Sequence, residues 1–148
     1  MAKRQEPIRK TAREMLDDLR SGHREASVSG PAAALKYLLR TLEGQQSLPN
    51  GVKAVVWDLV ASEKAALGDW AGVDEAVRTF LGYLPAMEEA LGHGFRAALL
   101  ATTALERGVQ ARSELGDFPG ALDLCDRAIA LDLGAHWEAK RESLDWAR

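Results

Sequence analysis

Basic side chains that recur at helical spacing are the residues of this sequence best suited to binding chemistry. Lys53, Trp57 and Lys64 would lie along one face of a helix, and Arg96 and Arg107 along one face of another. Guanidinium and ammonium groups form charge-assisted hydrogen bonds with carboxylates. The pattern therefore predicts a site for an acidic segment or a terminal carboxylate. The predicted partner-binding residues are Lys53, Trp57, Lys64, Arg96, Arg107 and Arg112.

The same residues also have a simpler, structural interpretation. Glu63, Glu106 and Glu114 are close to the basic residues in sequence, and such charges commonly pair on a mixed-charge surface. Trp57 would then be a large side chain that fills the gap between helix hairpins. Both interpretations fit the sequence.

Residue types that serve catalysis or metal binding are present, but not in productive patterns. The carboxylate pairs at 17–18, 74–75 and 88–89 are adjacent residues about 100° apart on a helix, which is typical of solvated surface. The three histidines lack the spacing of metal ligands, and Cys125 falls on an apolar stripe that favours a core role. No phosphate loop, dinucleotide fingerprint or nucleophile elbow is found. We therefore expect no enzymatic activity, cofactor or metal; an enzyme whose site the sequence hides is an alternative.

Composition favours a cytoplasmic protein. The 148 residues include one cysteine, so no internal disulfide forms and a reducing compartment fits best. No apolar run approaches the roughly 20 residues that span a bilayer. The net charge of −3 argues against a nucleic-acid partner, because proteins that coat nucleic acid carry a basic excess. In one alternative the chain is a regulatory domain of transcription control, and the basic stretch Lys3 to Arg13 contacts nucleic acid or a polymerase.

The spacing of apolar residues predicts helices along most of the chain. Gly22 is expected to end one of them, and Pro85 to mark the end of another or the start of a short further turn. Gly44–Gly51 is expected to be a mobile loop because it concentrates turn-forming residues. A polar loop is expected at His23–Gly30. The predicted helices are Glu6–Arg20, Pro31–Glu43, Val52–Leu67, Asp69 to about Tyr83, Phe95–Leu115, a helix that ends at Gly134, and Ala135–Arg148.

One fragment of the sequence occurs twice. LGDWAG at 67–72 returns as LGDFPG at 115–120, so that Gly68 and Gly116 are 48 positions apart (116 minus 68). Each copy lies between two helical stretches, which makes the repeated unit a helix, a tight Gly-Asp turn and a second helix. We expect the glycine to take the left-handed conformation and the aspartate to accept a hydrogen bond from the next helix.

With this repeat the chain resembles the tetratricopeptide repeat family. In the first copy Trp57, Val60 and Ala61 occupy the family's Trp, Leu and Gly places, and Pro85 falls on its Pro. The unit of 48 residues is longer than the family's unit of about 34, and such longer units also resemble the helical signalling domain of bacterial transcriptional activators. In the second copy Leu105, Gly108, Val109 and Arg112 stand on the first helix, and the small and apolar places of the second helix are supplied by Ala121, Cys125 and Ala128.

The resemblance implies an all-α fold, a tetratricopeptide-like right-handed stack of about three antiparallel helix hairpins plus a C-terminal capping helix. Residues 1–148 would form a single helical-repeat domain, with a divergent helix pair at 1–50, two hairpin units at 51–133 and the capping helix at 134–148. The first helices of such hairpins line a concave surface. The resemblance therefore implies a non-enzymatic protein-interaction or scaffold module that binds a peptide or protein partner there.

The last predicted helix carries two tryptophans that cannot share one face. Trp137 and Trp146 are nine residues apart, about 180° at 3.6 residues per turn. We expect at least one of them to be exposed or to pack against another chain, which predicts a homodimer through this helix. The sequence fits equally a groove that holds a peptide and one that a neighbouring subunit fills.

Overall fold

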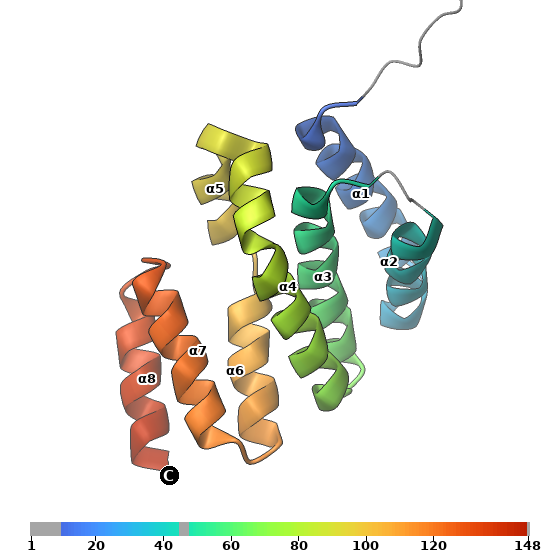
Figure 1. The fold of residues 1–148 in the computed structure, drawn as a ribbon. Helices are drawn as coiled ribbons and strands as arrows, with labels where there is room; N and C mark the ends of the chain where they lie inside the picture. Colours follow the sequence, from blue (N-terminus) through green and yellow to red (C-terminus); the bar gives the residue numbers. More distant parts are fainter. Residues whose placement is uncertain (1–9, 45–47, 148) are drawn as a thin grey trace, which may run out of the picture.

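The computed structural model describes residues 10–44 and 48–147, where the chain is helical and has no β-strand. This confirms the all-α prediction. Helices α1 to α4 pack each on the next, and α6, α7 and α8 continue the series because α6 packs on α4, whereas α5 contacts α4 but not α6 (Figure 1). In addition, α1 contacts α3, which in turn contacts α6. The helices are α1 (Ala12–Ser27), α2 (Pro31–Gly44), α3 (Asn50–Ala66), α4 (Trp70–Leu91), the short 3-10 helix η1 (Gly92–Gly94), α5 (Phe95–Leu100), α6 (Ala104–Glu114), α7 (Phe118–Ala130) and α8 (His136–Ala147).

The centre of the core lies between α3 and α4, which share the most extensive helix contact. Val55 and Val60 of α3 and Phe80 of α4 are completely buried. Burial of such side chains stabilises the fold by about 1.5–3 kcal/mol each. Because α3 also contacts α1, α2 and α6, it is buried on nearly every side, and only a few of its residues are available to a site.

The two Gly-Asp turns have the same backbone geometry, as the repeat predicts. Gly68 and Gly116 have φ values of +75° and +79°, the left-handed region in which glycine is favoured. Asp69 and Asp117 each accept a hydrogen bond at 3.0 Å from the backbone amide three residues further on. These side chains satisfy one of the free amides at the start of α4 and of α7.

The first helix differs from the prediction. Residues 6–9 of the predicted helix lie outside the described residues, and α1 begins at Ala12, capped by Thr11, and continues to Ser27. Gly22 therefore does not end the helix, and most of the expected loop at His23–Gly30 is helical. A Cβ atom at Gly22 would lie 2.1 Å from the hydroxyl oxygen of Tyr37, so this glycine instead permits the close approach of α2.

The prediction that Pro85 marks the end of the fourth helix or the start of a short further turn is also wrong. The helix α4 continues through this residue to Leu91. Pro85 itself is exposed, whereas Leu84 and Met87 on the other side of the helix are buried. Packing of this face outweighs the hydrogen bond that an interior proline removes.

The predicted long helix Phe95–Leu115 is interrupted. Its first part is α5 and its second part is α6, and the three residues Ala101, Thr102 and Thr103 lie between them. The hydroxyl of Thr102 donates to the carbonyl of Leu99 at 2.6 Å, and the backbone amide of Thr103 donates to a carboxylate oxygen of Asp58 at 2.9 Å. An amide bonded to a carboxylate cannot continue the helical hydrogen-bond ladder, so the chain restarts as α6.

The remaining helices agree with the predictions in kind. The segment Pro31–Glu43 is helical as α2, and α3 begins at Asn50, inside the expected loop Gly44–Gly51, of which 45–47 lie outside the described residues. On α8, Trp137 is 3% exposed and Trp146 is 83% exposed, which confirms that they occupy opposite faces. The right-handed tetratricopeptide arrangement and the division at residues 50 and 133 stay predictions.

Candidate functional site

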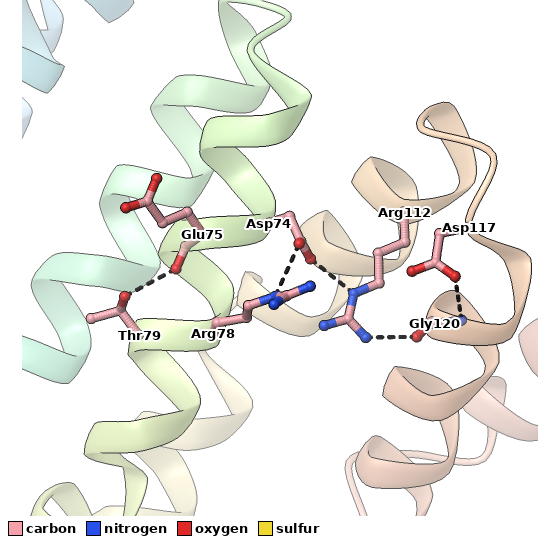
Figure 2. Close-up of polar contacts among 7 residues, drawn as sticks. All are labelled: Asp74, Glu75, Arg78, Thr79, Arg112, Asp117 and Gly120. Carbon is pink, nitrogen blue, oxygen red and sulfur yellow. Dashed lines mark hydrogen bonds and ion pairs between the residues drawn. The ribbon is translucent and has the colours of Figure 1, made fainter.

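The predicted site residue Arg112 links helices of the fold to one another. Its Nε atom donates to the carboxylate of Asp74 on α4 at 2.8 Å, and its Nη1 atom donates to the carbonyl of Gly120 on α7 at 2.8 Å. Figure 2 shows Asp74 between this guanidinium and that of Arg78, which pairs with it at 3.0 Å. Arg112 therefore joins three helices and has little surface left for a partner, since its side chain is 13% exposed.

Two interpretations from sequence change with this cluster. Asp74 was expected to be a solvated carboxylate, yet its side chain is only 16% exposed and binds two arginines. Arg112 was expected to face a partner or to pair with a nearby glutamate, and instead it reaches the preceding hairpin. The network is possible because Gly120 brings α7 close: a Cβ atom there would lie 3.0 Å from Cδ of Arg112.

Arg96 also serves the fold. Its guanidinium donates to the carbonyl of Leu131 at 2.7 Å and to the carbonyl of Asp132, at the end of α7. It lies 3.7 Å from the carboxylate of Asp132, which has a positive φ of 55°. Cations at this end of a helix satisfy free carbonyls and oppose the helix dipole. Arg96 is on α5 and Arg107 is on α6. The prediction that the two lie on one face of a single helix is therefore wrong.

The predicted residues of α3 are half-buried. Trp57 packs against the core, as its structural interpretation requires. Lys64 lays its aliphatic stem over the first turn of α4, since a Cβ atom at Gly72 would lie 2.8 Å from its Cδ. Among the described residues neither Lys53 nor Lys64 forms an ion pair, and Glu63, their expected partner, lies 3.0 Å from Nε2 of His23.

Asp58, the buried carboxylate of the described core, is not among the residues predicted from the sequence. Asp58 is 5% exposed, and burial raises the pKa of its carboxyl group to about 6. Hydrogen bonds from the amides of Thr103 and Ala104 oppose this rise. The charges of Arg20 and Arg107 oppose it too. An aspartate inside the apolar run of α3 was the available signal for this position.

Arg107 is a predicted site residue that lines a groove. The groove lies between α6 and α8 and combines cationic, polar and apolar side chains. Arg107 is half-buried, with its Nε atom enclosed and unpartnered, and its Nη1 atom is 3.5 Å from the side-chain oxygen of Gln110. Opposite it, Lys140 lies 5.1 Å from the ring centre of Trp137. The lining residues are Glu106, Arg107, Val109, Gln110, Lys140, Ser143 and Leu144.

Polar contacts also link α1 to α3, α3 to α6 and α6 to α8. His23 and Glu63 connect α1 to α3, and Asp58 connects α3 to the start of α6. Glu106 lies 3.6 Å from Nε2 of His136, the first residue of α8. Glu63 and Glu106 were considered as partners of the basic site residues, but each of these glutamates lies beside a histidine instead. The groove therefore has two cationic side chains, Arg107 and Lys140, against the one carboxylate of Glu106.

Other chemistry has little support in the described residues. Within 10–44 and 48–147 no three acidic, histidine or cysteine side chains are grouped so that they could hold a metal ion. Cys125 is completely buried, which confirms its core position, and burial raises the pKa of its thiol. None of the helices in these ranges combines the length and apolar character needed to cross a bilayer. Of the basic stretch Lys3–Arg13, only 10–13 is described, and there Lys10 pairs with Asp18.

Compared with known proteins, the chain matches no family model, no curated protein and no solved structure. The resemblance to tetratricopeptide repeats therefore stays a prediction from its own residues.

Proposed function

We propose that the chain is a protein-interaction or scaffold module that binds a peptide or a partner protein on a concave surface made by α1, α3, α6 and α8. In this proposal the helices form a tetratricopeptide-like right-handed stack, and α8 caps it. The module is cytoplasmic, carries no cofactor and performs no reaction. The supporting observation is the groove between α6 and α8, where Arg107 and Lys140 face the same space.

The chemistry of this groove favours a peptide that carries a carboxylate. Arg107 and Lys140 are positive, Gln110 and Ser143 offer hydrogen-bonding groups, and Glu106 is already close to His136. Val109 and Leu144 add apolar surface, which suits a side chain beside the carboxylate. Charge-assisted hydrogen bonds would orient the peptide and apolar burial would hold it.

The test is selection from a display library of random peptides, followed by binding measurements with synthetic versions. We expect carboxylate-rich sequences with a neighbouring apolar residue. The variant Lys140→Glu/Ser143→Glu should bind them at least about tenfold more weakly, a difference of about 1.4 kcal/mol in binding free energy. Arg107 is left unchanged, because a second carboxylate beside Asp58 would confuse binding with folding.

The control variant Arg127→Glu/Ala130→Glu makes the same change of charge at exposed positions of α7 and should bind as the wild type does. Circular dichroism establishes that all three proteins are equally helical. Equal binding by both variants would place the site elsewhere. Selection of no peptide, together with salt-sensitive binding of nucleic acid, would instead support a regulatory domain that contacts nucleic acid.

A further inference from the structure

The outer face of α2 forms an open groove with the turn between α3 and α4. Apolar side chains recur along α2 at helical spacing, and Leu67 supplies the opposite wall. Leu39 is 36% exposed and Leu67 is 47% exposed, so the apolar surface is in water. The lining residues are Ala32, Leu35, Lys36, Leu39, Arg40, Glu43 and Leu67, with two cations and one anion among them.

The repeat allows two equivalent helix contacts to be compared, that of α3 with the preceding α2 and that of α6 with the preceding α4. Lys64 and Arg112 precede the two Gly-Asp turns at the same distance. Arg112 on α6 donates a hydrogen bond to Asp74 on the preceding α4, so this helix contact is closed by a polar link (Figure 2). Lys64 on α3 has no such partner on α2 among the described residues. The surface between α2 and the turn after α3 is therefore an open groove lined by basic and apolar side chains.

The outer face of α8 has the complementary character. Glu138, Glu142 and Trp146 lie at intervals of four residues on one exposed face. Trp146 is 83% exposed, an unusual state for so large an apolar side chain. The cations of this helix are turned away, since Lys140 lies over the ring of Trp137 and Arg141 pairs with Asp126 at 2.6 Å.

We infer that these two faces are halves of one interface, and that the α8 face of one copy docks in the α2 groove of a second copy. Glu138 and Glu142 would face Lys36 and Arg40, and Trp146 would cover the exposed leucines. Helices α2 and α8 lie at opposite ends of the molecule and do not contact each other (Figure 1). The chain therefore cannot satisfy itself, and the contact is head-to-tail between copies.

This interface shares no residue with the groove between α6 and α8, so either proposal can fail without the other. It also differs from a symmetric dimer, in which α8 of one copy would pack on α8 of the next. A head-to-tail contact gives each copy one donor face and one acceptor groove, and this asymmetry can be measured.

The experiment compares a groove variant, Leu39→Ala/Arg40→Ala, with a face variant, Glu142→Ala/Trp146→Ala. Sedimentation velocity is recorded over about two orders of magnitude in concentration at low salt. We expect the average mass of the wild type to rise with concentration and each variant alone to stay monomeric. An equal mixture of the two variants should form a two-chain species, because the intact face of one fits the intact groove of the other.

The control for the groove variant is Leu115→Ala/Arg127→Ala, which also removes one leucine and one arginine from exposed positions and should associate like the wild type. A second comparison tests the charges: Arg40→Glu or Glu142→Lys alone should weaken association, and both in one chain should restore it. A wild type that is monomeric throughout would overturn the inference. So would association lost in the face variant but kept in the groove variant, which would indicate a symmetric α8 contact.

Discussion

The carboxylate of Asp58 on α3 accepts a hydrogen bond at 2.9 Å from the backbone amide of Thr103, 45 positions further along the chain. This contact marks the point where α5 ends and α6 begins, and it connects two neighbouring hairpins. Because Asp58 is 5% exposed, its charge is held in the core by backbone amides and by the nearby charges of Arg20 and Arg107. A buried carboxylate so placed makes the stability of the fold depend on pH.

We predict that Asp58 makes the protein more stable in mild acid than at neutral pH. Its pKa is about 6 in the folded chain, raised by burial from the ordinary value of 3.8 that it has in an unfolded chain. The folded state therefore binds the proton more tightly, and this contribution to stability is fully present below the unfolded pKa and is lost as pH rises through about 6. Between about pH 7.5 and about pH 5, Asp58 should add about 1 kcal/mol to the free energy of unfolding.

The measurement is urea unfolding of the wild type and of Asp58→Asn at several pH values. Asparagine keeps an oxygen that can accept from Thr103 but cannot titrate in this range. The difference between the two proteins isolates Asp58 from the other titrating groups, and it should change by the stated amount. A difference that is flat with pH would show that the carboxylate does not have a raised pKa.

Arg112 should contribute more to stability than an exposed charged residue does, because its side chain is 13% exposed and joins three helices. Arg112→Ala would leave Asp74 with only Arg78, whose side chain is 67% exposed, and would free the carbonyl of Gly120. We expect a loss of about 2–3 kcal/mol in the free energy of unfolding. Arg112→Lys should recover only part of it, because an ammonium group cannot bind both acceptors in the geometry of a guanidinium.

The comparison is Arg78→Ala, which removes the exposed partner of the same carboxylate. Exposed ion pairs contribute little, and this variant should lose less than about 0.5 kcal/mol. Equal losses for Arg78→Ala and Arg112→Ala would mean that the link to α7 contributes nothing, and that the cluster is only a surface ion-pair network.

Local signals in the sequence predicted the elements that depend on local chemistry. The Gly-Asp turns, the helix α2 and the opposite faces of Trp137 and Trp146 follow from positive φ, capping and helical period, which are properties of a few neighbouring residues. The continuation of α4 through Pro85 and the interruption before α6 depend on distant packing. No local pattern at Thr103 reveals that its amide will meet Asp58, so the predicted helix there was too long.

The candidate site was predictable only in part for the same reason. Helical spacing places Arg96, Arg107 and Arg112 on related faces, but it does not show which of them will find an acceptor in another helix. Arg96 meets carbonyls at the end of α7, and Arg112 meets Asp74. Arg107 is left beside the groove, where Lys140 joins it from the C-terminal helix, which was predicted to cap the stack and not to contribute to the site.

Gly108 should resist substitution because α6 passes close to two other helices. A Cβ atom there would lie 2.7 Å from Cδ1 of Leu124 and 2.9 Å from Cγ1 of Val77. Gly108→Ala is expected to lower the free energy of unfolding by about 1–3 kcal/mol through overpacking. In Gly82→Ala, a helical position with open space, the same substitution should raise stability by about 0.5–1 kcal/mol. Thermal unfolding of both variants tests the contrast, and a loss at both positions would contradict it.

The two repeated turns should contribute equally to stability. Asp69 and Asp117 accept from the amide three residues on at the same distance of 3.0 Å, and their backbone angles nearly coincide. Asp69→Ala and Asp117→Ala should each cost about 1 kcal/mol, because each leaves one helix amide without its cap. The turns share no partner, so the double variant should lose the sum within about 0.5 kcal/mol. Urea unfolding of the three variants measures this. A double variant that loses much more than the sum would show that the two hairpins are coupled, and the Arg112 network beside Asp117 would be the first place to look for the link.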